Sequence, residues 1–185
     1  MSESEHVGGS HPNCDGNTFM VDVFGYLLVK YNPGLILDLG CGYGHVLQWF
    51  SQFPLNLVGV DGDKEAIEKS VFAGTKVLHD FTKGPYVHGT PFDLVWCAEV
   101  LEHIEEKYLP NVAPCFQASR YVVITHAEPH QFGHHHVNCK PDSYWIGKFS
   151  EWGLKHNESE TAILRRTDRW HASWGRRTLM FFERP

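Results

Sequence analysis

The sequence lacks any arrangement of cysteines that would crosslink the chain by disulfides or bind a structural metal. Its cysteines number five and no two form a C-x-x-C pair, so neither a disulfide framework nor a zinc ribbon is indicated. They are Cys14, Cys41, Cys97, Cys115 and Cys139. Long hydrophobic runs and a signal-peptide pattern are also missing, since no stretch approaches the roughly 18 apolar residues of a membrane span. We therefore expect a cytoplasmic protein with reduced thiols and no membrane partner.

An excess of positive charge is lacking as well. Lysine and arginine number 16 against 22 aspartates and glutamates, which gives a formal net charge of −6 and argues against general nucleic-acid binding. The cations are unevenly spread, because six arginines lie at or beyond position 165. A solvated surface and a site for an anionic substrate are both open interpretations of this basic end.

The length is that of one domain. A chain of 185 residues can bury about 70% of the surface that its unfolded form exposes, so it needs no disulfide or structural metal to be stable. Residues 1–16 are polar and aperiodic, and we expect them to be flexible unless they close over a site. Residues 17–185 are expected to form a single domain.

The most informative segment is an apolar run at residues 36–39 that leads into glycines at alternate positions, Gly40, Gly42 and Gly44. Glycines after a strand let the main chain approach a ligand, and the helix that follows offers unpaired N–H groups. A dinucleotide fingerprint would need glycine or alanine where His45 stands, so a pyrophosphate site is less favoured than a site for a single nucleoside.

A second apolar strand, residues 57–60, ends in an acid, Asp61. An acidic side chain about twenty residues after the first glycine suits the two hydroxyls of a ribose. Two further strands fit the same order: one covers residues 76–79 and is followed by Asp80, and the next covers residues 92–97. The ends of neighbouring parallel strands are therefore expected to share one ligand.

The run D-L-G-C-G-Y-G at residues 38–44 resembles the first motif of the class I S-adenosylmethionine-dependent methyltransferases, and the resemblance extends over residues 17–125. It implies S-adenosylmethionine as cofactor, with Asp61 on the ribose, Asp80 on the adenine amino group and Cys97 in the wall of the site. The positions that match the family's cofactor-binding residues are Asp38, Gly40, Gly42, Gly44, Asp61, Asp80 and Cys97.

The remaining pattern alternates short apolar strands with helical segments. Strands are predicted at residues 35–39, 57–60, 76–79, 92–97 and 121–125, and helices at 19–30, 43–53, 63–72, 99–108 and 143–152. Residues 154–165 and 178–183 are predicted to form a closing antiparallel pair. Such alternation favours a parallel sheet covered on both faces. With the resemblance, it predicts an α/β fold: a Rossmann-like, doubly wound, mostly parallel seven-stranded sheet with an antiparallel C-terminal strand.

An E-x-x-E-H segment follows the fourth predicted strand. On a helix Glu99, Glu102 and His103 would share one face, and two carboxylates with an imidazole can hold a divalent cation. The segment resembles one in ubiquinone-pathway O-methyltransferases and in enzymes that methylate the 2′-hydroxyl of small RNAs, where metal use is associated with these positions and a further ligand after strand five. A brace for the helix, without any metal, is the alternative.

A histidine-rich loop, residues 126–136, supplies the candidates for the further ligand. Three consecutive histidines end it, and adjacent side chains diverge, so we select His135 as the inward-facing one. The set Glu99, Glu102, His103 and His135 would suit Mg²⁺, Mn²⁺ or Fe²⁺, with Zn²⁺ not excluded. His103 and His135 are also the candidate catalytic bases.

Three functions remain open. The first is O-methylation of a small hydroxylated molecule such as a phenol, a sugar or a natural-product intermediate. The second is 2′-O-methylation of RNA with a divalent metal, for which Trp170 and Trp174 beside the arginines would supply an aromatic platform. The third is a non-catalytic subunit that keeps the fold. The identity of the methyl acceptor and the oligomeric state are not determined by the sequence.

Overall fold

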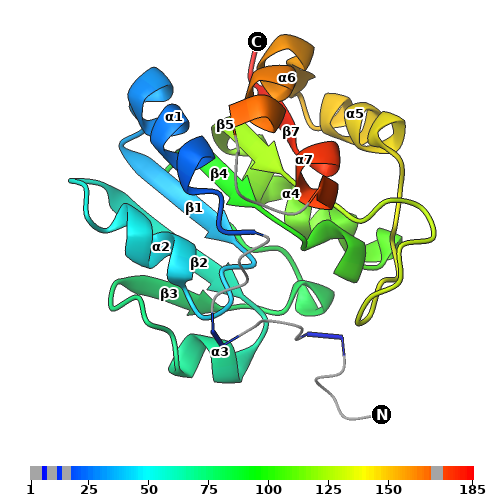
Figure 1. The fold of residues 1–185 in the computed structure, drawn as a ribbon. Coiled ribbons are helices and arrows are strands. Elements are labelled where there is room, and N and C mark those ends of the chain that lie inside the picture. Colours follow the sequence, from blue (N-terminus) through cyan, green and yellow to red (C-terminus); the bar gives the residue numbers. More distant parts are fainter. Residues whose placement is uncertain (1–5, 8–11, 14–17, 168–172) are drawn as a thin grey trace.

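A seven-stranded sheet forms the centre of the computed structural model, which describes residues 6–7, 12–13, 18–167 and 173–185 (Figure 1). The strands are β1 (Leu35–Leu39), β2 (Asn56–Asp61), β3 (Thr75–Leu78), β4 (Phe92–Cys97), β5 (Ser119–Ile124), β6 (Lys155–His156) and β7 (Met180–Glu183). Their order is β3-β2-β1-β4-β5-β7-β6. The first five strands pair in parallel, and β7 runs antiparallel to both β5 and β6. The predicted fold class is confirmed.

Helices cover both faces of this sheet. They are α1 (Val21–Tyr31), α2 (His45–Phe50), α3 (Lys64–Glu68), α4 (Leu109–Gln117), α5 (Asp142–Glu151), α6 (Glu158–Thr167) and α7 (Ser173–Thr178), with 3-10 turns η1 (Phe81–Lys83), η2 (Leu101–His103) and η3 (Glu106–Tyr108). In the described part of the chain, no helix combines the length and the apolar character needed to cross a bilayer. Most of residues 1–16, for which we predict flexibility, lies outside the described residues.

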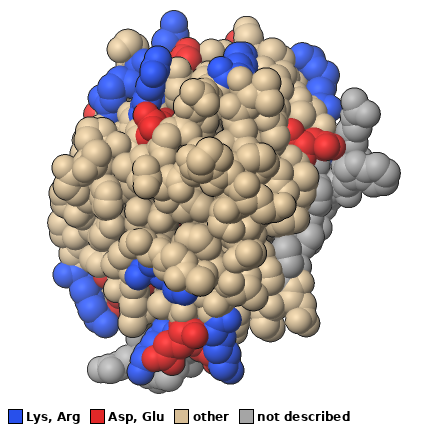
Figure 2. Space-filling model, turned by 90° about the vertical axis from the view of Figure 1, so that its left-hand side faces the viewer, with Lys and Arg blue, Asp and Glu red and all other residues tan. Residues whose placement is uncertain are grey.

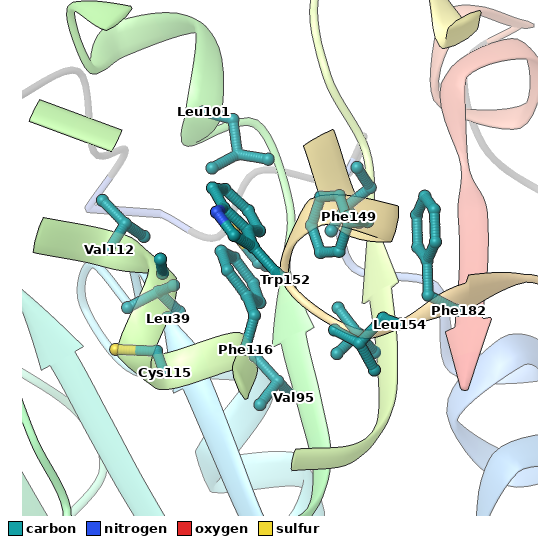
Figure 3. Packing of buried hydrophobic residues seen from close by; sticks show 14 of the residues in the cluster. Leu39, Val95, Leu101, Val112, Cys115, Phe116, Phe149, Trp152, Leu154 and Phe182 are labelled. Carbon is teal, nitrogen blue, oxygen red and sulfur yellow. The ribbon is translucent and has the colours of Figure 1, made fainter. Parts of the chain in front are cut away.

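The strands are apolar on both sides because each side faces a separate core. Ile36 of β1 belongs to a cluster with α1, α2 and α6, whereas its neighbour Leu37 packs with α4 and α5 on the opposite face. Figure 3 shows the second cluster, in which the rings of Phe116 and Trp152 stack 5.5 Å apart. Alternate side chains of a strand point to opposite faces, so a doubly covered sheet needs such continuous apolar runs.

The helix predicted for residues 99–108 is wrong. The chain forms the turns η2 and η3 there, and Glu99 has a left-handed backbone with φ +53°, which interrupts any helix at its start. The actual helix, α4, begins at Leu109 and was not predicted. Glu99, Glu102 and His103 therefore do not share a helix face, and their relative positions depend on the turn.

The strand predicted for residues 154–165 is also wrong over most of its length. Only β6 is extended, and α6 follows it after Asn157, whose side-chain oxygen accepts a 2.9 Å bond from the Glu160 N–H. Acidic residues occupy the first turn of α6 and arginines the last, as the helix dipole favours. An Asn-x-x-Glu cap was therefore present in the sequence. The short β6 still pairs with β7, so part of the closing pair is confirmed.

Other boundaries shift by a few residues. The helix predicted from residue 19 begins as α1 at Val21, and its N-cap, Met20, makes no side-chain cap bond. The N-cap of α3 is Asp63, whose side chain accepts bonds from the N–H groups of Glu65 and Ala66. That helix ends at Glu68, earlier than predicted. These shifts leave the ends of β1, β2 and β4 where the predicted site requires them.

Candidate active site

A cavity of about 500 Å³ lies beyond the carboxyl ends of the parallel strands. The loops after β1, β2, β3 and β4 line one part of it, and the loop at residues 131–136 lines another. The chain runs from β1 to β2 and β3 on one side of β1 and then crosses to β4 on the other side, and ligands of doubly wound sheets bind at such a switch point.

The glycine run after β1 forms a tight main-chain cradle. Gly40, Gly42 and Gly44 all have a left-handed backbone, with φ values of +76°, +49° and +78°, which favours glycine. A Cβ at Gly40 would collide with Cγ2 of Val100. Because Gly40 and Gly42 line the cavity, a bound molecule can reach their main chain without a side chain between.

Asp61 joins this cradle to the end of β2. One carboxylate oxygen accepts the N–H of Gly42 at 2.7 Å and the other accepts the N–H of Asp63 at 2.7 Å. Burial raises the pKa of Asp61, and the main-chain hydrogen bonds oppose that rise. Each oxygen keeps a lone pair for a further donor, so the group can hold the two hydroxyls of a ribose.

Asp38 lies at the cavity wall with only 3% of its surface exposed, and its Oδ2 atom has no hydrogen-bond partner among the described residues. Burial, with the nearby charge of Asp61, raises the pKa of Asp38 to about 8. A buried polar atom without a partner is costly. A cationic or hydrogen-bonding ligand in the cavity would satisfy it.

Asp80 also lines the cavity, but its carboxylate already has partners. Oδ1 accepts bonds from the N–H and the hydroxyl of Thr82, and Oδ2 lies 3.1 Å from Nε2 of His6 and 3.3 Å from Nζ of Lys83. Burial alone would raise the pKa of Asp80, but these bonds outweigh it and lower the pKa to about 2. An adenine amino group would therefore have to share or replace one of these contacts.

His6 and Val7 were not predicted as site residues, yet both line the cavity. A Cβ at Gly62 would lie 2.6 Å from Cγ1 of Val7, so the absence of a side chain at position 62 makes room for this packing. The part of the N-terminal segment that the structure describes thus borders the cofactor side. No sequence signal distinguished these two residues.

Cys97 is placed differently from the prediction. Its side chain is fully buried in the core against α4 and α5, and the neighbours Trp96 and Ala98 line the cavity instead. The alternation of side chains along β4 explains the difference, since adjacent residues face opposite sides of the sheet. Burial raises the pKa of the Cys97 thiol, which keeps it inert.

Glu99 lies at the cavity wall and is held by Thr125 at the end of β5. The Thr125 hydroxyl donates to Oε1 of Glu99 at 2.7 Å and accepts the N–H of the same residue at 3.0 Å. These two bonds stabilise the left-handed backbone at Glu99. Thr125 was not predicted as a site residue, although its position at the end of a strand was a usable signal.

Glu102, His103 and His136 come together beside the other part of the cavity, which the two histidines line, with one possible ligand atom of each lying within 4.8 Å of the others. Glu102 is 0% exposed, and neither of its carboxylate oxygens has a hydrogen-bond partner in the described structure. Burial and the Glu99 carboxyl raise the pKa of Glu102 well above its usual range. Such a group is costly to bury alone, so it is suited to a bound cation.

Each of the two histidines has a ring nitrogen without a hydrogen-bond partner in the described structure. Burial and the proximity of His136 lower the pKa of His103 to about 4, and its Nδ1 atom is buried without a partner among the described residues. His136 donates from Nδ1 to the carbonyl of Gln131 at 2.9 Å, which leaves Nε2 free. A hydrogen bond from the other ring nitrogen is how proteins orient ligating histidines.

The predicted ligand set is thus only partly brought together. His136 takes the place predicted for His135, which lines the cavity but lies outside the group. Glu99 also lines the cavity and is not part of the group. The N–H groups of Val137 and Asn138 both donate to the carbonyl of Glu102, at 2.9 and 3.0 Å. This contact between the histidine loop and η2 brings His136 close to Glu102, and no spacing in the sequence predicts the contact.

Comparison with known proteins agrees with this geometry. A family model described as a methyltransferase domain matches residues 20–168. The chain therefore belongs to the methyltransferase-domain family, and its predicted place among the class I S-adenosylmethionine-dependent methyltransferases is confirmed.

Two curated relatives are ubiquinone biosynthesis O-methyltransferases. The mitochondrial enzyme of Schizosaccharomyces pombe is 36% identical over 81 residues, covering 38% of this chain and 29% of the relative. The Aromatoleum aromaticum enzyme is 29% identical over 109 residues, covering 50% and 44%. The chain thus spans less than half the length of the curated relatives that it matches.

Solved structures share the fold at low identity. Magnesium protoporphyrin IX methyltransferase from Synechocystis PCC 6803, solved with bound SAM, has a TM-score of 0.65 and 17% identity, covering 90% of this chain and 78% of that one. The plantazolicin methyltransferase BpumL, solved with SAH, has a TM-score of 0.59 and 15% identity, covering 99% and 86%.

Proposed function

We propose that this protein transfers the methyl group of S-adenosylmethionine to a hydroxyl oxygen of a small molecule. The observation that carries the proposal is that one cavity joins two different sets of groups. The glycine cradle with Asp38 and Asp61 lies in one part, and His103 and His136 line another. The first set fits a nucleoside, and the second fits the oxygen that accepts the methyl group.

Charge supports the cofactor assignment. Five acidic side chains line the cavity, those of Asp38, Asp61, Asp80, Glu99 and Glu105, and no lysine or arginine is among the described lining residues. The unpaired oxygen of Asp38 and the free lone pairs of Asp61 fit the cationic cofactor. The cofactor supplies a sulfonium methyl, whose C–S bond breaks as the O–C bond forms, so that S-adenosylhomocysteine and the hydroxyl proton are released. Transfer needs the acceptor held in line at roughly 3 to 3.5 Å.

We propose further that Glu102, His103 and His136 hold a divalent metal. The oxygens of Glu102 and Nδ1 of His103 have no partner in the described structure, and Nε2 of His136 is free. Mixed oxygen and nitrogen donors suit Mg²⁺, Mn²⁺, Fe²⁺ or Zn²⁺. Such an ion supplies Lewis-acid chemistry that lowers the pKa of a hydroxyl. A pKa near 4 keeps His103 neutral at pH 7, which suits a ligand better than a base.

A small acceptor is favoured over RNA. Figure 2 shows lysines and arginines near opposite ends of one face, close to acidic residues, rather than in a continuous basic track. Several C-terminal arginines are already bound: Arg165 pairs with Asp142 at 3.0 Å and Arg177 with Glu128 at 2.8 Å. A cavity rich in carboxylates repels phosphates. Trp170 and the side chain of Trp174 lie outside the described part of the structure, so the aromatic platform remains a prediction. The cytoplasmic location is likewise a prediction.

The test is turnover of S-adenosylmethionine to S-adenosylhomocysteine, measured by mass spectrometry with panels of phenols, sugars and short RNAs. Methylation of a small phenol or sugar, insensitive to salt between 50 and 300 mM, is expected. Salt-sensitive methylation of RNA alone would favour the second function. Cofactor binding in calorimetry without turnover on any acceptor, or no cofactor binding at all, would favour a non-catalytic subunit.

A further inference from the structure

Phe132 is an exposed aromatic residue at the edge of the candidate active site. Its side chain is 99% exposed, and it lines the cavity that contains the candidate active site. An exposed phenyl ring contributes nothing to the stability of the core. Exposed apolar groups at the edge of a site often contact a ligand or a partner.

The main chain on either side of Phe132 is held in place. The Gln131 side chain accepts the N–H of Glu128 at 3.1 Å, and the Gln131 carbonyl accepts both His136 Nδ1 and, at 3.6 Å, the thiol of Cys139. On the other side, a Cβ at Gly133 would collide with Nε2 of His136. Phe132 therefore extends from a turn that is fixed to the same histidine that faces Glu102 and His103.

Other side chains at this part of the cavity indicate what Phe132 would contact. Ile104 and Tyr108 line the cavity and are half-buried, as is His135. Glu99 and Glu105 also line it, and no cation is among its described lining residues. This part of the site thus offers apolar surface and negative charge, which disfavours an anionic acceptor and a bare sugar phosphate.

We propose that Phe132 determines specificity by packing against an apolar ring or chain attached to the acceptor, while the acceptor hydroxyl reaches the group of Glu102, His103 and His136. This inference rests on the proposed function and names its substrate class: uncharged, hydroxylated molecules that carry an apolar extension. Removal of the phenyl ring should lower kcat/KM for such acceptors by about 10- to 100-fold, the contribution expected for one buried aromatic side chain.

The experiment compares two acceptors that share one reacting group, catechol and 4-hexylcatechol, in wild type, Phe132→Ala and Phe132→Tyr. In Phe132→Ala, kcat/KM for 4-hexylcatechol is expected to fall 10- to 100-fold through KM, while catechol changes less than about threefold. Phe132→Tyr keeps the ring and should retain most of the preference. Val29→Ala, which removes an 88% exposed apolar side chain of α1, is the matched control and should change neither value.

The outcomes separate this inference from the proposed function. An active wild type in which Phe132→Ala slows both catechols equally, or neither, overturns the role of Phe132 and leaves the proposed function intact. A wild type that methylates RNA but no catechol overturns both. Cofactor affinity, measured by calorimetry, and the melting temperature should be unchanged in Phe132→Ala because the ring is exposed, and a change in either would point to a structural role.

Discussion

Nδ1 of His136 donates a hydrogen bond to the main-chain carbonyl of Gln131 at 2.9 Å. A carbonyl can only accept, so Nδ1 carries a proton and Nε2 is the ring nitrogen left for a ligand. The residue before it, His135, has a left-handed backbone with φ +47°, and it is not part of the group with Glu102. Two adjacent histidines thus lie in different positions relative to Glu102.

The first prediction compares these neighbours. His136→Ala should lower kcat about tenfold or more, because it removes one of the proposed ligands. His135→Ala should leave kcat nearly unchanged. Steady-state formation of S-adenosylhomocysteine measures both. Equal losses in the two variants would contradict the arrangement of the loop.

The second prediction tests the metal. Glu102→Gln keeps the shape of the side chain but removes the carboxyl group that would bind the ion, so it should lower metal content, measured by mass spectrometry of dialysed protein, and reduce the rate. Excess chelator should do the same to wild type, and neither treatment should alter cofactor affinity. Full activity in chelator would remove the metal from the proposal.

The third prediction concerns the ribose. Asp61→Ala should raise the Kd for S-adenosylmethionine about 30- to 100-fold, the loss expected for hydrogen bonds to a charged group. Asp63→Ala is the matched control, since Asp63 caps α3. It should cost about 1 kcal/mol of stability with little change in Kd. Titration calorimetry decides between them, and a similar Kd in both variants would exclude Asp61 as the ribose ligand.

The fourth prediction is a pH dependence of stability in the cofactor-free protein. The folded pKa of Asp38, about 8, lies above its ordinary value of 3.8, so between these values the folded state holds a proton that the unfolded chain has released. This contribution is present below pH 4 and is lost as the pH rises through 8, at up to about 1.4 kcal/mol per pH unit. Asp38→Asn should remove that slope.

Urea unfolding of wild type and Asp38→Asn at pH 5, 6, 7 and 8 measures the effect. With each step to higher pH, the free energy of unfolding of Asp38→Asn should increase relative to that of wild type. Parallel curves would show that the pKa of Asp38 is the same in the folded and the unfolded protein, because other titrating groups are common to wild type and variant.

The fifth prediction compares two glycines. Gly40→Ala should destabilise the protein by about 2 to 4 kcal/mol, because φ is +76° and the new methyl group would collide with Val100. Gly25→Ala lies within α1, with no other group within 4 Å of the new Cβ, and should stabilise by about 0.5 to 1 kcal/mol. Urea unfolding measures both, and a tolerated Gly40→Ala would contradict the cradle geometry.

Local sequence pattern predicted those parts of the fold where only one secondary structure can bury the residues present. The apolar runs at β1 and β4 could only be buried on both faces of a sheet, and β1 and β4 occur within the predicted bounds. The segment at Glu99 was predicted as a helix because its spacing allowed one. Its left-handed backbone depends on Thr125, 26 residues away, and no local pattern contains that contact.

The sequence alone determined the family, the order along the chain of the strands that carry the cofactor residues, and the positions where a left-handed main chain requires glycine. These follow from short-range periodicity and backbone sterics. Tertiary structure decided which histidine faces Glu102, that Cys97 is directed into the core, and that Phe132 remains in solvent at the cavity. Those outcomes depend on contacts between distant segments, such as the bonds from Val137 and Asn138 to the Glu102 carbonyl. Their geometry exists only once the sheet and loops have packed together.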